Sequence, residues 1–256
     1  MGMQINAIEI KNLSKSFRGM YAVDHLNMTV PRGAIYGFIG ENGSGKSTTE
    51  KLICGHLVPD AGEIKLFGKD YTDPGVRIRV GALIENAGCF PNSSVYQNLR
   101  MQTINLGLKN PDEEIKRVLE IVRMSENAHL KFKNCSLGMK QRIGIAMALL
   151  GDPALLILDE PINGLDTDGI RIMREILIDI TQKYGCTVLI SSHILDLLHQ
   201  IDIIFFKSYL ICFDLSNADG VLIKIFNNLF RSGLIVNANI TRFIFFQARI
   251  FRGKKH

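Results

Sequence analysis

Residues 35–52 have the sequence IYGFIGENGSGKSTTEKL, a short apolar run followed by a glycine-rich turn and the start of a helix. Gly40, four further residues and then Gly45-Lys46-Ser47 have the spacing of a P-loop. Glycine permits the positive φ angles with which a chain can wrap its N–H groups around a polyphosphate. The following helix adds unpaired N–H groups and the positive end of its dipole. The stretch therefore predicts a nucleotide phosphate site, in which the Lys46 ammonium reaches the phosphates and the Ser47 hydroxyl ligates Mg²⁺.

Length and composition are those of a globular protein. The chain has 256 residues, of which 46% are hydrophobic and 21% charged, so one large domain, alone or with an appendage, is expected. Five scattered cysteines without a CxxC pair indicate reduced thiols in a cytosolic compartment and exclude a zinc or disulfide scaffold. We expect no secretory signal and no segment that spans a membrane unaided.

The positive charge is concentrated at the end of the chain. The formal net charge is +5, but residues 220–256 carry seven basic residues and no acidic one. The basic excess therefore gives no reason to assign a nucleic-acid partner to the main domain, and we expect none.

Hydrophobic patterns predict an alternation of strands and helices. Strands are expected at 5–11 and 22–30, in the segment 58–68, and at 79–85, where the last one ends at Glu85. Residues 86–140 are predicted to form a helical insert, in which Asn110 is the N-cap of a helix that starts at Pro111. A further helix is expected from Met139 to Leu150.

Two later apolar runs end in polar residues. Residues 154–158 predict a strand buried on both faces, which brings Asp159 and Glu160 to the edge where ligands bind in open α/β sheets. Adjacent carboxylates there suit one Mg²⁺ ligand and one base that positions water, although a solvated turn is the alternative. The run TVLISSHI has the same pattern and ends at His193, for which a structural and a functional role are both open.

Three motifs in order carry a family resemblance: GENGSGKST at 40–48, SLGMKQ at 136–141 and LLILDEP at 155–161. Together they resemble the ATP-binding subunit of ABC transporters, over about residues 5–207. The resemblance implies an α/β fold: a P-loop NTPase core of the ABC ATPase type with an antiparallel β-subdomain and an inserted helical subdomain. The nucleotide-binding domain would span residues 1–219, with the helical insert at about 86–140 and a basic, apolar tail at 220–256.

The resemblance also implies ATP and Mg²⁺ as cofactors and a role for each matching residue. Phe17 lies where the family has an adenine-stacking aromatic, although without the resemblance a residue that fills a gap in the core is the favoured interpretation. Asp159 would hold Mg²⁺ through water, Glu160 would be the general base, and His193 would contact the γ-phosphate. The implied phosphate-binding residues are Gly40, Glu41, Asn42, Gly43, Ser44, Gly45, Lys46, Ser47 and Thr48.

The middle motif implies a dimer. Ser136 and Gly138 match the signature that completes the ATP site of the opposite subunit, and residues 163–166 match a loop that crosses the dimer contact. The expected assembly is a head-to-tail homodimer, or a pair with a related ATPase subunit. Separate transmembrane permease subunits would hold it at the cytoplasmic face of the membrane.

Two positions depart from the family pattern. Glu85 stands where most members have glutamine; a carboxylate there can still ligate Mg²⁺, but it carries a charge. The surrounding sequence resembles the subgroup for bacitracin and lantibiotic export or immunity. Cys135 replaces a usual leucine as a small apolar residue.

The end of the chain and the function leave alternatives. Residues 222–230 predict an amphipathic helix that packs on its own domain, unless it is disordered or lies on a membrane, and a shifted reading frame would explain the same composition. An ATP-hydrolysing transporter subunit is the leading hypothesis. The alternatives are a non-transporting ABC ATPase regulator and a nucleotide-binding module with impaired turnover.

Overall fold

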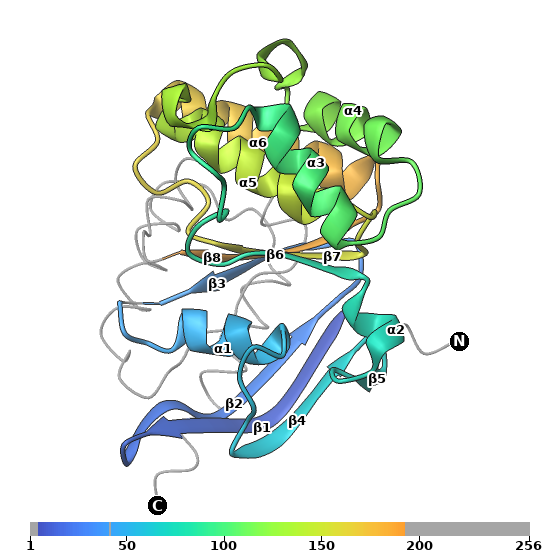
Figure 1. The fold of residues 1–256 in the computed structure, drawn as a ribbon. Coiled ribbons are helices and arrows are strands. Elements are labelled where there is room, and N and C mark those ends of the chain that lie inside the picture. The colour runs from blue at the N-terminus through green and yellow to red at the C-terminus, as the bar shows by residue number, and fades with distance from the viewer. Residues whose placement is uncertain (1–4, 41, 193–256) are drawn as a thin grey trace, which may run out of the picture. The chain divides into compact units, whose positions relative to one another are not determined.

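The computed structural model describes residues 5–40 and 42–192, whose ribbon is shown in Figure 1. The predicted strand, turn and helix are present as β3 (Ile35–Ile39) and α1 (Lys46–Ile53), joined by the glycine-rich turn. Glu41, His193 and the tail at 220–256 lie outside the described residues.

A parallel sheet carries the glycine-rich turn at one of its edges. Its strand order is β3, β8 (Thr187–Ser192), β7 (Leu155–Asp159) and β6 (Val80–Leu83). Alternate residues of β7 pack into two different cores: Leu156 and Leu158 into one, Leu155 and Ile157 into the other. Burial on both faces explains the continuous apolar run that predicted this strand.

An antiparallel sheet forms the second layer of strands. Its order is β2 (Met20–Val30), β1 (Ile8–Phe17), β4 (Ala61–Leu66) and β5 (Lys69–Asp70), and the short helix α2 (Pro74–Arg77) follows it. The predicted strand at 5–11 was too short, because β1 continues through the polar segment to Phe17. Register shifts after Ile10 and Leu13 keep that segment paired with β2.

Helices cover the parallel sheet on both faces (Figure 1). On one face lie α3 (Val95–Asn105), α4 (Pro111–Ile121), α5 (Leu137–Leu149) and α6 (Thr167–Gln182), with the 3₁₀ turns η1 (Ser125–Asn127) and η2 (Phe132–Asn134) between α4 and α5. On the other face α1 lies between the two sheets. The predicted helical insert is therefore present, and the fold is the predicted α/β core with an antiparallel sheet and a helical insert.

One detail of the helix predictions was wrong, namely where α5 begins. Asn110 is the N-cap residue of α4, which begins at Pro111 as predicted, although its side chain accepts no backbone N–H and its amide donates to Glu113 at 3.0 Å. The helix predicted from Met139 begins two residues earlier, because the Ser136 hydroxyl accepts the Met139 N–H as its N-cap.

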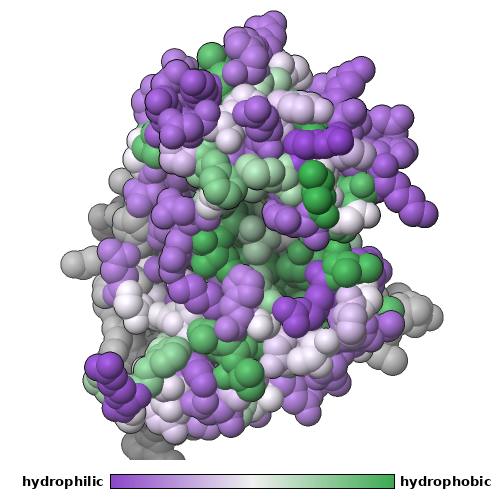
Figure 2. Space-filling model, viewed as in Figure 1, coloured by the Kyte–Doolittle hydropathy of each residue, from purple (hydrophilic) through white to green (hydrophobic). Residues whose placement is uncertain are grey.

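Part of the surface is apolar. Figure 2 shows hydrophobic residues gathered in a hollow between the helices above it and α1 and the antiparallel sheet below it. Ile78 and Phe90, on the segments before and after β6, are 78% and 58% exposed. Within residues 5–40 and 42–192, no helix has both the length and the hydropathy needed to cross a membrane.

Candidate functional site

The glycine-rich turn packs directly on the antiparallel sheet. Gly45 has φ 90°, and a Cβ built on it would lie 2.1 Å from the carbonyl oxygen of Ala22 in β2. Any side chain at this position would therefore displace backbone. A Cβ on Gly40 would lie 2.5 Å from Ser44 Oγ, so the turn closes on itself there as well. A turn this tight presents backbone N–H groups as an anion-binding loop requires.

The first turn of α1 brings a cation to this loop. Lys46 is 7% exposed, and its Nζ donates to the carbonyl oxygen of Gly40 at 2.7 Å, so the ammonium is held across the loop. Thr49 Oγ1 donates to the carbonyl oxygen of Gly45 at 2.9 Å. The other predicted phosphate-binding positions on this stretch, Asn42, Ser44 and Thr48, are at least partly exposed.

Ser47 and Asp159, which lie 112 residues apart in the chain, meet beside the loop. Ser47 Oγ donates to Asp159 Oδ2 at 2.9 Å, while Ser191 Oγ donates to Asp159 Oδ1 at 2.6 Å. The register of β7 and β8, which places Asp159 opposite Ser191, produces this arrangement. Hydroxyl and carboxylate oxygens are the ligands that Mg²⁺ prefers, and Mg²⁺ sites in nucleotide enzymes take few protein ligands besides phosphate oxygens. The residues present therefore fit a magnesium-nucleotide.

Glu160 lies next to this cluster with a constrained backbone. Its φ is 49°, and its N–H donates to the carbonyl oxygen of Ser191 at 3.2 Å. A non-glycine residue at positive φ is uncommon and often marks a functional position. The backbone geometry therefore agrees with a functional position, while the predicted role as general base stays a prediction.

Glu50 is a site residue that the sequence analysis missed. It is fully buried one turn after Lys46, and neither of its carboxylate oxygens has a hydrogen-bond partner of normal geometry within the described residues. Burial, and then the negative charge of Asp159, raise its pKa to about 8. The Ser191 hydroxyl offsets part of this shift, but its proton is donated to Asp159. The sequence did contain a signal: an acidic residue at position 50, on the face of the predicted helix that packs into the core.

Glu85 is paired with a lysine. It follows β6, and its Oε1 accepts from Lys51 Nζ at 2.6 Å, which lowers the pKa of the Glu85 carboxyl. Within the described residues no hydrogen bond joins it to Ser47 or Asp159. Its predicted role as a Mg²⁺ ligand stays a prediction.

Phe17 ends β1 and is 45% exposed, with the Lys15 ammonium 5.6 Å from its ring centroid. It is opposite Met20 in β2, the strand whose Ala22 contacts Gly45. The exposed ring excludes the alternative of a core-filling aromatic, and adenine stacking stays a prediction.

The signature residues belong to a second corner. Ser136 caps α5, and Gly138 lies in its first turn. A Cβ on Gly138 would be 3.5 Å from a Leu165 methyl, and one on Gly164 would be 3.0 Å from a Leu137 methyl. The signature and the loop at 163–166 are therefore packed against each other. Within the part of the chain that the structure describes, no hydrogen bond connects this corner to the phosphate loop, and its role toward another subunit stays a prediction.

Comparison with known proteins agrees with this geometry. Residues 23–163, more than half of the chain, match the family model described as ABC transporter. The chain belongs to the ABC transporter family.

Relatives of this ABC domain are found among antibiotic transport proteins. It is 40% identical over 196 residues to the bacitracin transport ATP-binding protein BcrA of Bacillus licheniformis, which covers 76% of this chain and 64% of the relative. Identity to the lantibiotic transport ATP-binding protein SrtF of Streptococcus pyogenes is also 40%, over 73% of this chain and 80% of that protein. The chain thus spans somewhat less than two thirds of the length of the Bacillus relative.

Solved structures show the same fold. The structure of cbiO1 from Clostridium perfringens, part of the ABC transporter complex cbiONQ, superposes with a TM-score of 0.68 at 28% identity. The match covers 75% of this chain and 80% of cbiO1. The predicted fold class and family are therefore confirmed.

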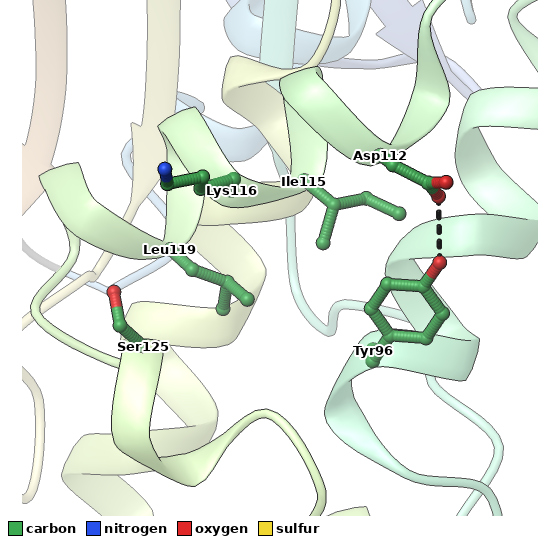
Figure 3. A pocket seen from close by; sticks show the side chains of 6 residues that line it. All are labelled: Tyr96, Asp112, Ile115, Lys116, Leu119 and Ser125. Carbon is green, nitrogen blue, oxygen red and sulfur yellow. Dashed lines mark hydrogen bonds between the residues drawn. The ribbon is translucent and has the colours of Figure 1, made fainter.

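A shallow cavity of about 180 Å³ lies away from the phosphate loop, on the helical insert of this ABC domain (Figure 3). The Tyr96 hydroxyl donates to Asp112 at 2.6 Å on one side of it, and Ile115 and Leu119 form its apolar floor. None of its lining residues belongs to the loop or to the carboxylate cluster, so it is not part of the candidate nucleotide site.

Proposed function

We propose that this chain is the ATP-binding and ATP-hydrolysing subunit of an ABC transporter. The observation that carries the proposal is the hydrogen bond between Ser47 and Asp159 beside a loop closed around the Lys46 ammonium. A hydroxyl, a carboxylate and a buried cation at the mouth of a P-loop suit a magnesium-nucleotide and little else.

Each residue of the site has a role that follows from its position. The N–H groups of the loop and of the first turn of α1 bind the phosphates, and Lys46 neutralises part of their charge. Ser47 and, through water, Asp159 would hold Mg²⁺, which would supply positive charge to the phosphates. Glu160 accepts a proton from the attacking water, and His193 contacts the γ-phosphate. Phe17 stacks on the adenine, and Glu85 adds a carboxylate to the metal region.

Asn42, Gly43 and Ser44 of the phosphate loop are exposed in the part of a single copy that the structure describes. We infer that Ser136 and Gly138 of a second copy, or of a related subunit, close this loop head to tail, because the start of α5 offers unpaired N–H groups to an anion. Hydrolysis would remove the phosphate that bridges the two copies, and the dimer would part.

The partners follow from the relatives. Their names support a transporter of peptide antibiotics of the bacitracin or lantibiotic type. We infer that a separate membrane permease completes this transporter. We propose that the permease contacts the apolar hollow of Figure 2, at the cytoplasmic face of the membrane, since exposed apolar patches mark interaction sites.

Mg²⁺-dependent ATP hydrolysis by the full-length chain tests the proposal, alone and with its co-purified membrane subunits. Glu160→Gln is expected to bind ATP as tightly as the wild type but to hydrolyse it at least about a hundredfold more slowly, because the water loses its base. If the wild-type chain hydrolyses no ATP even with its membrane subunits, the proposal fails. The chain would then be a nucleotide-binding module without turnover.

A further inference from the structure

The signature corner lies at the N-terminal ends of two helices, α5 and α6. Ser136 caps α5, and Asp166 caps α6 by accepting the Gly169 N–H at 2.8 Å. The contacts of Leu137 with Gly164 and of Leu165 with Gly138 hold the two ends together. Any group that sets the relative position of α5 and α6 therefore also sets the shape of this corner.

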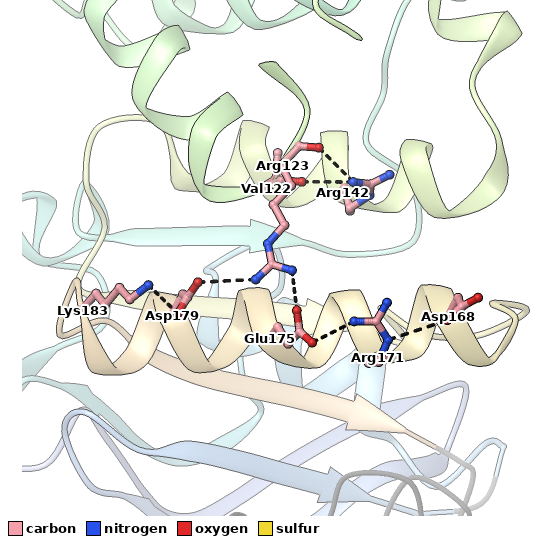
Figure 4. A network of polar contacts seen from close by, with 8 residues as sticks. All are labelled: Val122, Arg123, Arg142, Asp168, Arg171, Glu175, Asp179 and Lys183. Atoms are coloured by element: carbon pink, nitrogen blue, oxygen red, sulfur yellow. Dashed lines mark hydrogen bonds and ion pairs between the residues drawn. The ribbon is translucent and has the colours of Figure 1, made fainter. Parts of the chain in front are cut away.

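Arg123 connects the helical insert to α6 (Figure 4). Its guanidinium pairs with Glu175 and lies 3.8 Å from Asp179, and these two acids are one turn apart on α6. Arg171 of α6 and Lys183, the C-cap residue of the same helix, pair with the same acids at 3.0 and 2.9 Å. Among the ion pairs in Figure 4, those of Arg123 are the ones that cross from the insert to α6.

The backbone of Arg123 is tied to α5. Arg142 of α5 donates to the carbonyl oxygen of Arg123 at 3.0 Å and to that of Val122 at 3.4 Å. These carbonyls belong to the C-terminal end of α4, where helix carbonyls lack intrahelical partners. Residue 123 is thus attached to α5 through its carbonyl and to α6 through its side chain.

Position 123 also has an unusual residue for its backbone conformation. Helix α4 ends in a Schellman motif, in which Met124 N–H donates to Leu119 and Arg123 N–H donates to Glu120. Arg123 occupies the left-handed position with φ 57°, where glycine is usual because other residues are strained. Arg123 thus combines a strained backbone conformation with a side chain that contacts another helix, α6.

We propose that Arg123 is a positioning residue that fixes α5 and α6 to each other, so that the signature corner and the loop at 163–166 move as one unit. The inference rests on the proposed function, because the corner is taken to bind the nucleotide of a second copy. Exposed ion pairs contribute little to folding stability, so the effect of Arg123 is on geometry.

Arg123→Gly separates geometry from stability. Glycine relieves the left-handed strain, so the variant should resist urea at least as well as the parent, whereas its α6 contacts are lost. In a Glu160→Gln background, which retains ATP, the dissociation constant of the MgATP-bound dimer is measured by analytical ultracentrifugation. We expect Arg123→Gly to raise it about tenfold, the size of a modest coupling between sites. The affinity of the single chain for a fluorescent ATP analogue should not change.

Two further variants supply the controls. Lys183→Gln also removes a positive charge that pairs with Asp179. The lost contact does not join α6 to the helical insert, so the dimer should be unaffected. The double variant Arg123→Gly/Glu175→Gln should form a dimer with the same dissociation constant as Arg123→Gly alone. The two substitutions remove opposite partners of the same ion pair, so their effects should not add. A dimer constant within twofold of the parent for Arg123→Gly would overturn the proposal.

Hydrogen exchange gives a measurement that does not depend on dimers. The amides of Met139 and Gly169 donate to the caps Ser136 and Asp166, and both should exchange at least about threefold faster in Arg123→Gly than in Lys183→Gln. If the parent never dimerises with MgATP, the proposed function fails. The hydrogen-exchange measurement would still test whether Arg123 positions the ends of α5 and α6. Equal exchange in the two variants would refute the positioning role.

Discussion

The buried carboxyl of Glu50 makes folding stability depend on pH in a direction opposite to that of most acids. Its pKa is raised from 4.5 to about 8 by burial, so between these values the folded chain binds a proton that the unfolded chain has lost. Stability from this group is fully present at low pH and is lost as the pH rises through the window. Each pH unit is worth at most about 1.4 kcal/mol, and the whole window about 5 kcal/mol as an upper limit.

Glu50→Gln removes the titration and keeps the shape of the side chain. The difference in free energy of unfolding between Glu50→Gln and the wild type should therefore grow in favour of the variant from pH 5 to pH 8, by several kcal/mol. Glu50→Leu should show the same pH dependence, because leucine has no titratable group. Its apolar side chain at this fully buried position also needs no hydrogen-bond partner. Urea unfolding followed by circular dichroism, in EDTA and without nucleotide, measures both.

Glu126→Gln, at the exposed turn η1, controls for the loss of one formal charge. The reasoning would be refuted if the difference between Glu50→Gln and the wild type stayed constant from pH 5 to pH 8. It would then follow that the Glu50 carboxyl is ionised to the same extent in the folded and unfolded chains.

Three further results are expected. Lys46→Ala should weaken ATP binding at least about tenfold in an equilibrium titration, because the loop loses a charge-assisted phosphate contact, while Lys51→Ala on the same helix should not. Gly45→Ala should unfold at clearly lower urea than Gly43→Ala, since both add strain at positive φ but only the Cβ of residue 45 meets backbone; equal effects would count against the contact with Ala22. Glu85→Gln should leave ATP affinity near that of the wild type but change ATP hydrolysis in the presence of the membrane subunits, because the charge beside the metal region is lost; identical hydrolysis would show that this charge has no role in turnover.

Several features of the site could be predicted because they are local in sequence. The spacing of Gly40, Gly45 and Lys46 specifies a turn followed by a helix start, and the structure has both. The apolar run before Asp159 predicted a buried strand for the same reason, since both faces of β7 pack into a core. Asn110 is the N-cap residue of α4 as predicted, but the sequence pattern did not specify that its amide donates to Glu113 and that its side chain makes no capping hydrogen bond.

The sequence alone determined the family, the phosphate loop, the helical insert and most of the strands, because motifs and local spacing specify them. It did not predict β5, α2 or α6. Tertiary structure decided which distant groups meet: Ser47 with Asp159, Arg123 with Glu175, and Glu50 with the carboxylates beside the loop. The physical reason is that hydrogen bonds and desolvation act over a few ångströms in space. Residues reach that range only when the register of β7 and β8 and the packing of the helices bring them together.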